Sequence, residues 1–333
     1  MSAKGHHFLP QFLLKGFASR NSRTECYCWY FRRGTKACEA NIKGIGQQKH
    51  FHGNPRQTNL EVLIAERECV YAPLVQSLQK GEIEERDKPL IDEFVAHLVI
   101  RGRNLRQGFL KATDDLLTAM VKHFTDPKNH ASRNDRLFEY VKKDPRFSTL
   151  LTSLPAEVRE PFTRLFRKEI EELPIEDGMR QVMAVLQQSL PESASQAHIK
   201  TLSKDFAPQK QIEKMQHLSW KIWRVPSQTL IIGDVGVLFL EIETGQFKHP
   251  ILVPQQPAQA FLPVSHEFML VGTQVESLAI DTEQLNSAQA ALSREFFVSS
   301  TRTEKELTYE RLLGSRADLV SKAEISELLR SEF

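Results

Sequence analysis

Apolar and polar positions along the chain divide it into strand-like ends and a helical middle. Residues 25–32 are rich in aromatic side chains and predict a strand. Residues 33–35 contain Gly34 and predict a turn, after which residues 36–43 are expected to return antiparallel. The N-terminal part of the chain is therefore predicted to contain a β-hairpin.

The middle of the chain follows a helical period. Residues 60–79 predict a helix that Asn59 caps and Gly81 ends, and Pro73 is expected to kink or split it. A longer helix begins at residue 87 or 88 and places one stripe of side chains on a single face: Phe94, Leu98, Arg101, Leu105 and Phe109. Further helices are predicted near residues 106–125, 136–143, 155–173 and 177–190, with another between 193 and 218 that breaks near Pro208.

The period changes at residue 219. Short strands are predicted at residues 220–225, 229–232, 236–242, 250–253 and 268–271, joined by Pro, Gly and Asp turns. Helices are predicted at residues 281–296 and 323–332. Strands at both ends with helices between them favour an α+β fold, with a predominantly helical middle and a small, mostly antiparallel sheet built from N- and C-terminal segments.

No internal repeat or low-complexity linker divides the 333 residues, so residues 1–333 are predicted to form a single unit. We distinguish three segments within it. Residues 1–58 are basic and contain strands, residues 59–218 form a helical bundle, and residues 219–333 are β-rich with C-terminal helices.

Composition narrows the class of protein. The chain is 41% hydrophobic and 26% charged, as is typical of a soluble globular protein. No apolar run approaches the roughly 18 residues that span a bilayer. The apolar run at residues 12–14 is short and Lys15 follows it, so no signal peptide is expected. We expect a cytoplasmic protein whose four cysteines are free thiols.

Charge is unevenly distributed. Residues 1–58 contain ten Lys or Arg and two acidic residues, which gives +8 there and leaves −6 for the rest of the chain. Basic residues beside aromatic ones suit phosphate contacts and base stacking, and the candidates are Lys15, Arg32, Arg33 and Lys49. The alternative is a solvated basic surface that complements the acidic remainder, since no nucleic-acid-binding motif accompanies the charge. Nucleic acid or a nucleotide is the predicted partner, and no membrane partner is expected.

The same segment contains an inventory of zinc ligands. Cys26, Cys28, Cys38, His50 and His52 supply the thiols and imidazoles that zinc prefers. Their spacing matches no standard zinc motif, and thiols at alternate strand positions are usually part of the core or the surface.

The opening stretch carries a resemblance to a known family. His7-x-x-Pro10-Gln11-Phe12-x-Leu14-x-x-Phe17 resembles the first motif of the bacterial domain-of-unknown-function family DUF 4238. Further pieces follow in the family's order: Leu60-Glu61, Glu68 with Ala72, residues 98–101, residues 229–234, residues 262–265 and Leu285-Asn286. The resemblance implies a set of residues and no reaction. His7 belongs to the motif and His6 does not, so we expect His6 to be solvated.

The chain departs from the family pattern at two turns. Gly233-Asp234-Val235-Gly236 stands where the family has Ser-Asp-Asn-Pro, and His266 stands where a proline is usual. These departures affect the turn geometry and any role for Asp234.

Two carboxylates share one face of a predicted helix. Glu61 and Glu68 are seven residues apart, two helical turns, and Ile64 and Val75 lie on the same face. A carboxylate that is buried without a partner is costly, and Arg101 on the inward stripe of the next helix is the natural partner.

One hypothesis gathers His7, Glu61, Glu68, Arg101 and Asp234 into a catalytic cleft. His7 would be a general base or a metal ligand, and Glu61 and Glu68 would be metal ligands or the base, with Mg²⁺ or Mn²⁺ as the candidate ions. Arg101 and Lys15 would contact a phosphate, and Arg101 would stabilise its charge. The alternative is a buried Arg–Glu network that fixes the helix register, with His7 donating to a backbone carbonyl.

Two functions follow from these alternatives. The first is a phosphodiester hydrolase, similar to a nuclease, that acts on nucleic acid or nucleotides in a bacterial defence or stress module. The second is a non-enzymatic sensor or adaptor whose polar network is structural. Walker, Gly-x-Gly-x-x-Gly, His-Glu-x-x-His and Gly-x-Ser-x-Gly motifs are all absent, so no standard motif decides between them.

Overall fold

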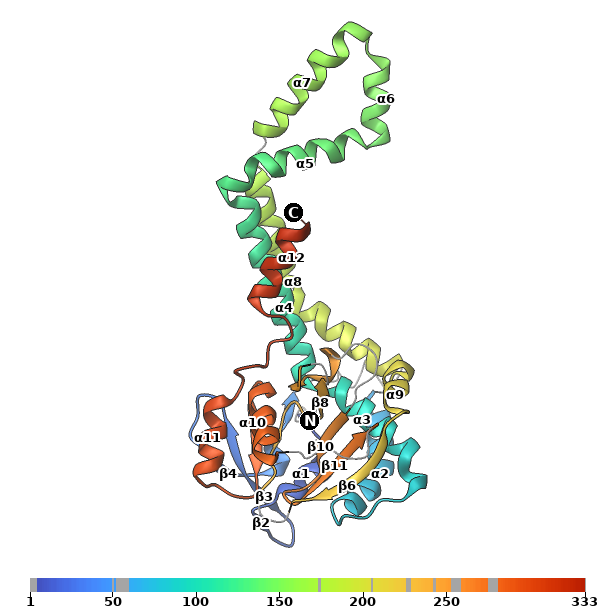
Figure 1. The fold of residues 1–333 in the computed structure, drawn as a ribbon, viewed down its shortest axis with the longest axis vertical. Helices are drawn as coiled ribbons and strands as arrows, with labels where there is room; N and C mark the ends of the chain where they lie inside the picture. The colour runs from blue at the N-terminus through green and yellow to red at the C-terminus, as the bar shows by residue number, and fades with distance from the viewer. Residues whose placement is uncertain are drawn as a thin grey trace. The chain divides into compact units, whose positions relative to one another are not determined.

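A computed structural model describes residues 5–49, 51, 60–172, 175–204, 206–225, 229–241, 244–252, 259–274 and 281–332. The fold is α+β, with a mainly helical middle and small antiparallel sheets, as the pattern predicts (Figure 1). The chain groups into two compact units, one of Met1–Phe109 with Glu192–Leu319 and one of Leu110–Pro191 with Val320–Phe333. The three-segment division at residues 58 and 218 stays a prediction.

The first unit contains a sheet built from both ends of the chain. Its strand order is β2-β3-β12-β7, and β4 pairs with β3. The strands are β2 (Arg20–Asn21), β3 (Cys26–Arg32), β4 (Cys38–Asn41), β7 (Ile232–Gly233) and β12 (Phe296–Ser299). Phe31 and Phe297 face each other in the register and their rings stack at 4.6 Å. The predicted joining of N- and C-terminal segments therefore occurs between β3 and β12.

A second sheet comes from residues 219–273 alone. Its order is β6-β11-β10-β8-β9, with every described pairing antiparallel. The strands are β6 (Ser219–Arg224), β8 (Leu238–Glu241), β9 (Gln246–Lys248), β10 (Gln259–Pro263) and β11 (Phe268–Thr273). All five residues of β10 are buried, so this strand lies inside the unit.

Helices complete the first unit. They are α1 (Gln11–Leu14), α2 (Leu60–Leu78), α3 (Lys88–Arg101), the first turns of α4 (Arg103–Thr125), the end of α8 (Ile175–Lys204), α9 (Gln209–Met215), α10 (Thr282–Leu292) and α11 (Glu304–Leu312). The described part of α2 runs through Pro73 without splitting. From Phe94 to Arg101 every residue of α3 is buried, which identifies α3 as a core helix.

Three local expectations are wrong. The stripe drawn through Arg101 to Phe109 is broken because Gly102 is extended and α4 starts afresh, which leaves Phe109 52% exposed. The strand expected at residues 250–253 is a 3₁₀ helix over Pro250–Leu252. The helix expected to reach residue 296 ends at Leu292, because residues 296–299 pair with β3 as β12. Pairing with a distant strand overrides the local helical pattern there.

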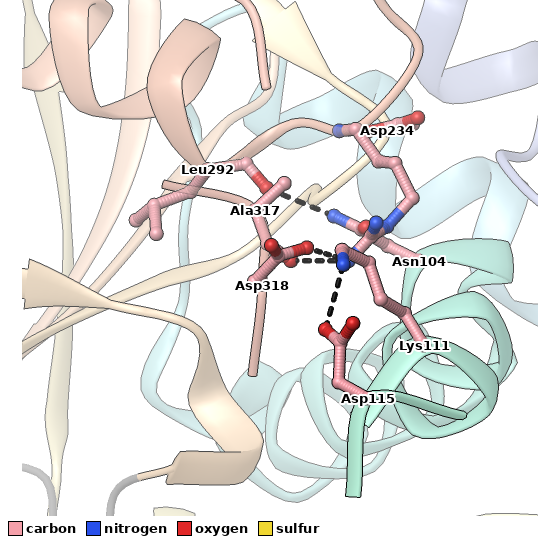
Figure 2. Close-up of polar contacts among 8 residues, drawn as sticks. Asn104, Lys111, Asp115, Asp234, Leu292, Ala317 and Asp318 are labelled. Atoms are coloured by element: carbon pink, nitrogen blue, oxygen red, sulfur yellow. Dashed lines mark hydrogen bonds and ion pairs between the residues drawn. The ribbon is translucent and has the colours of Figure 1, made fainter. Parts of the chain in front are cut away.

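The second unit is helical. It contains the remainder of α4 and α8 with α5 (His130–Lys142), α6 (Pro145–Ser153), α7 (Ala156–Glu172) and α12 (Lys322–Glu332). Asp144 caps α6 by accepting the backbone N–H of Arg146 at 2.8 Å. In α4, Lys111 forms an ion pair with Asp115, one turn further on, at 2.7 Å (Figure 2). Among the described residues, no helix is long and apolar enough to cross a membrane.

Candidate functional site

The opening stretch of the chain is fixed in the first unit by its apolar side chains. We call residues 5–17 the N-terminal segment; it consists of β1 (Gly5–His7), α1 and a 3₁₀ helix at Lys15–Phe17. Strand β1 pairs antiparallel with β5 (Gln47–Lys49). Leu13, Leu14 and Phe17 are fully buried, so the segment is part of the core.

Arg101 joins this segment to α2. It occupies the last turn of α3 and is 2% exposed. Its Nε and Nη2 donate to the carbonyl oxygen of His7 at 3.1 and 2.5 Å, and its Nη1 lies 2.7 Å from Glu68 Oε1. The Nη1 contact is an ion pair without the alignment of a hydrogen bond. The predicted partnership of Arg101 with Glu68 is confirmed, and the carbonyl of His7 is a further partner.

The imidazole of His7 is engaged at both nitrogens. Nδ1 lies 3.1 Å from the carbonyl oxygen of Ile45, and Nε2 lies 2.8 Å from the side-chain nitrogen of Gln11. A carbonyl only accepts, so Nδ1 carries the proton and Nε2 accepts from the amide of Gln11. Burial lowers the pKa of His7, with a smaller contribution from the positive charge of Arg101. The ring is therefore held neutral.

His6 is buried, so the expectation that it is solvated is wrong. It is 4% exposed, and its Nε2 forms an ion pair with Glu61 Oε1. Successive residues of a strand point to opposite sides, which sends the His6 and His7 side chains to different neighbours. Glu61 thus reaches the histidine outside the family motif.

The predicted metal ligands are occupied by protein groups. Glu61 pairs with His6, Glu68 pairs with Arg101, and His7 contacts Ile45 and Gln11. In the parts of the chain that the structure describes, no group of three or more His, Cys, Asp or Glu side chains is placed to hold a metal ion. This set does not fit a bound Mg²⁺ or Mn²⁺ in the arrangement seen.

Asp234 makes its contacts at a different place. Its two carboxylate oxygens accept the backbone N–H groups of Arg294 and Glu295 at 2.8 and 2.9 Å. The same corner, between α10 and β12, is held by Asn104, whose side chain donates to the carbonyl of Leu292 at 3.0 Å (Figure 2). No described hydrogen bond or ion pair joins Asp234 to His7, Glu61, Glu68 or Arg101, which leaves it in a structural corner.

Polar side chains at α10 form hydrogen bonds with the backbone of residues 229–236, as a neighbouring strand would. Asn286, Gln289 and Ser293 lie on one helical face and accept the backbone N–H groups of Ile231, Gly233 and Val235 respectively. Asn286 and Gln289 also donate to the carbonyls of Thr229 and Gly236. Sequence reasoning found Asn286 through the family resemblance only. The i, i+3, i+7 spacing of polar side chains in a buried helix is the signal for the set.

Gln79 is a further residue that sequence reasoning missed. Its side-chain nitrogen donates to the carbonyls of Phe12 and Leu13 in α1 and of Val264 after β10, at 3.0, 3.3 and 3.0 Å. The end of α2 is thereby tied to the N-terminal segment and to the second sheet. A single glutamine shows no pattern that could have identified this role.

Three of the four basic residues predicted to contact nucleic acid lie at the protein surface. Lys15, Arg32 and Arg33 are exposed, and none of them makes an ion pair with another described residue. Arg32 ends β3, and Arg33 begins the turn into β4. Lys49 belongs to β5, but its side chain lies outside what is described, as do His50, His52 and Asn59. All four cysteines are free thiols.

The pH dependence of stability tests the state of Asp234. Burial raises the pKa of this carboxyl to about 7, against the two N–H bonds that lower it. A raised pKa in the folded state adds stability below the unfolded pKa of about 4, and this contribution disappears as the pH rises through 7. The unfolding free energy of the native chain, measured in urea relative to Asp234→Asn, is expected to fall by about 2–4 kcal/mol between pH 4 and pH 8. If the unfolding free energies of the native chain and Asp234→Asn changed in parallel with pH, the raised pKa of Asp234 would be contradicted.

Comparison with known proteins yields a family and no characterised relative. A family model described as "Protein of unknown function (DUF4238)" matches residues 5–303. No curated protein and no solved structure matches the chain.

Proposed function

The chain belongs to the DUF4238 family, and we propose that it is a non-enzymatic sensor or adaptor whose buried Glu, Arg and His network is structural. The observation that carries the proposal is the orientation of Arg101. Its guanidinium donates to the main chain of the N-terminal segment and pairs with Glu68. A catalytic arginine instead presents its N–H groups to the place where charge develops in the transition state.

The two carboxylates and His7 support the same proposal. A general base needs a free lone pair within reach of its substrate, whereas the lone pair of His7 at Nε2 accepts from Gln11. Glu61 and Glu68 each face a basic side chain from the core of the unit, His6 and Arg101. In each pair the basic side chain is buried and the glutamate is partly buried, and such pairs hold elements in register when every charge has a partner.

A nucleic acid or nucleotide is the partner that we propose for the adaptor. Lys15, Arg32 and Arg33 are exposed and carry no counter-charge among the described residues, so they are available to phosphates. The free thiols support a reducing compartment, and we propose the cytoplasm of a bacterial cell.

Cleavage and binding assays on one preparation test the proposed function. The full chain is incubated with DNA, RNA and nucleotides in Mg²⁺ and in Mn²⁺, beside Glu68→Gln. We expect no hydrolysis above the Glu68→Gln background. We also expect oligonucleotide binding that weakens with salt and is reduced at least tenfold in Arg32→Glu/Arg33→Glu, because phosphate contacts release counterions.

The phosphodiester hydrolase stays a prediction that the same assays decide. Metal-dependent cleavage by the native chain that is lost in Glu68→Gln, with the melting temperature retained, would establish the hydrolase and remove the adaptor proposal. Equal oligonucleotide binding by the native chain and Arg32→Glu/Arg33→Glu would remove the proposed contact surface.

A further inference from the structure

A pocket of about 350 Å³ lies in the first unit, and neither His7, Glu61, Glu68 nor Arg101 lines it. Its walls come from the end of α3, the first turns of α4, the last turns of α8 and helix α9. Most of the lining is apolar, with Leu105, Ala197 and Ile251 as examples. Volumes of a few hundred Å³ with mainly apolar walls and a few polar groups are typical of small-molecule sites.

Arg106 is a buried cation in the wall of this cavity. It is 8% exposed, and its hydrogen bonds go to neutral acceptors: the carbonyl of Phe51, the hydroxyl of Ser195 and the amide oxygen of Gln48, at 3.2, 3.2 and 3.3 Å. These bonds use three of the five N–H groups that an arginine carries.

No carboxylate of the described residues balances this charge. Arg101, which is also buried, forms an ion pair with Glu68. Arg106, in contrast, forms no ion pair with any described residue. Its guanidinium stacks on the Phe51 ring at 4.0 Å, which fixes its plane. Burial and the neighbouring charge of Arg103 lower its pKa to about 10. A buried cation of this kind is stabilised by an anion that enters the cavity.

Two further residues of the wall, His198 and Gln211, carry buried acceptor atoms that have no hydrogen-bond partner among the described residues. His198 Nε2 donates to the carbonyl of Ile100 at 2.8 Å, so Nδ1 carries a lone pair, and this nitrogen has no described partner. The side-chain oxygen of Gln211 is likewise buried and has no hydrogen-bond partner in the described parts of the chain. Buried acceptors are normally hydrogen-bonded, so two of them on residues of one wall favour a ligand that carries a donor group.

We propose that this cavity binds a small organic acid with an apolar or aromatic body, whose carboxylate pairs with Arg106 and whose hydroxyl or amine group donates to His198 and Gln211. The positive charge of Arg106 favours an anionic ligand, and the apolar walls favour a ligand with an apolar or aromatic body. The acceptor atoms of His198 and Gln211 favour a ligand that also carries a hydrogen-bond donor. A cavity of about 150 Å³ holds benzene, so the larger volume here accommodates a ring with both substituents. The proposal goes beyond the proposed function, because neither Arg101 and Glu68 nor the exposed Arg32 and Arg33 line this pocket.

Titration calorimetry with 4-hydroxyphenylacetate tests the proposal on the full chain. This acid combines an aromatic ring, a carboxylate and a hydroxyl donor, and we expect it to bind at one site. Its methyl ester, which lacks the charge, is expected to bind at least tenfold more weakly. Phenylacetate, which lacks the hydroxyl, is expected to bind several-fold more weakly, and inorganic phosphate, which lacks the body, is expected to give no measurable binding.

Two variants connect binding to this cavity. Arg106→Met is expected to weaken the binding of 4-hydroxyphenylacetate at least tenfold. Ala197→Phe places a ring in the cavity from an exposed helical position, so it should fold normally and abolish binding even if Arg106→Met does not fold. The proposal is overturned if 4-hydroxyphenylacetate gives no binding, if its ester binds equally well, or if folded Ala197→Phe retains the native affinity.

Discussion

Replacement of Arg101 by methionine is expected to lower the melting temperature by about 6–20 °C. The substitution keeps much of the side-chain volume but leaves the Glu68 carboxylate without its ion-pair partner and the carbonyl of His7 without its donor. Removal of one partner from a buried ion pair costs about 3–5 kcal/mol. In a protein of this size each kcal/mol corresponds to about 2–4 °C. Thermal unfolding followed by circular dichroism measures the change.

Two further variants separate this effect from a general loss of charge. Arg86→Met removes an arginine whose ion pair with Glu84 is exposed, and it should change stability by less than about 1 kcal/mol. The double variant Arg101→Met/Glu68→Met should lose less than Arg101→Met alone, because no unpaired carboxylate is left. A melting temperature for Arg101→Met within two degrees of the native value would show that the network does not stabilise the fold.

Replacement of Gly16 by alanine is expected to destabilise the first unit by about 3 kcal/mol, near the upper end for overpacking a core. A Cβ atom at residue 16 would lie 2.2 Å from the carbonyl oxygen of Val264 and 2.9 Å from Cα of Ser265. Both atoms belong to the main chain and cannot rotate away. The carbonyl of Gly16 also accepts the N–H of His266 at 2.9 Å, so this contact between the N-terminal segment and the β10–β11 turn would open.

Gly102→Ala is the matched control in the same unit. Its nearest neighbours to an added Cβ are 3.8 and 4.0 Å away, and its φ of −61° suits any residue. This variant should leave stability unchanged or raise it by up to about 1 kcal/mol. Urea unfolding of the two variants measures the difference, and equal midpoints would contradict the close packing at residue 16.

Local pattern predicted the elements where local and tertiary preferences agree. Residues 25–32 are rich in aromatic side chains and residues 268–271 are apolar, and these stretches form β3 and β11. Residues 88–101 have a helical period and form α3. Residues 293–296 show the limit. The helix was predicted to continue to residue 296, yet it ends at Leu292 and Phe296 begins β12, because β3 offers backbone groups and Phe31 offers a ring.

Sequence reasoning named residues that contact one another in the structure, but it did not predict all of their partners. Helical spacing placed Glu68 and Arg101 on inward faces, and their pairing is seen. It could not show that the guanidinium of Arg101 also reaches the carbonyl of His7, 94 residues away in the chain. It also assigned Asp234 to the same set, whereas the Asp234 carboxylate accepts the backbone N–H groups of Arg294 and Glu295.

The sequence by itself determined the α+β class, the family of the chain, the exposed basic residues at the end of β3 and the inward face of α3. These properties follow from periodicity, composition and a contiguous motif, which neighbouring residues define. Only the tertiary structure decided which polar groups meet: His6 with Glu61, Arg101 with the backbone of His7, and Arg106 with no carboxylate among the described residues. Spacing fixes the face on which a side chain lies, but packing of distant segments fixes what that face contacts.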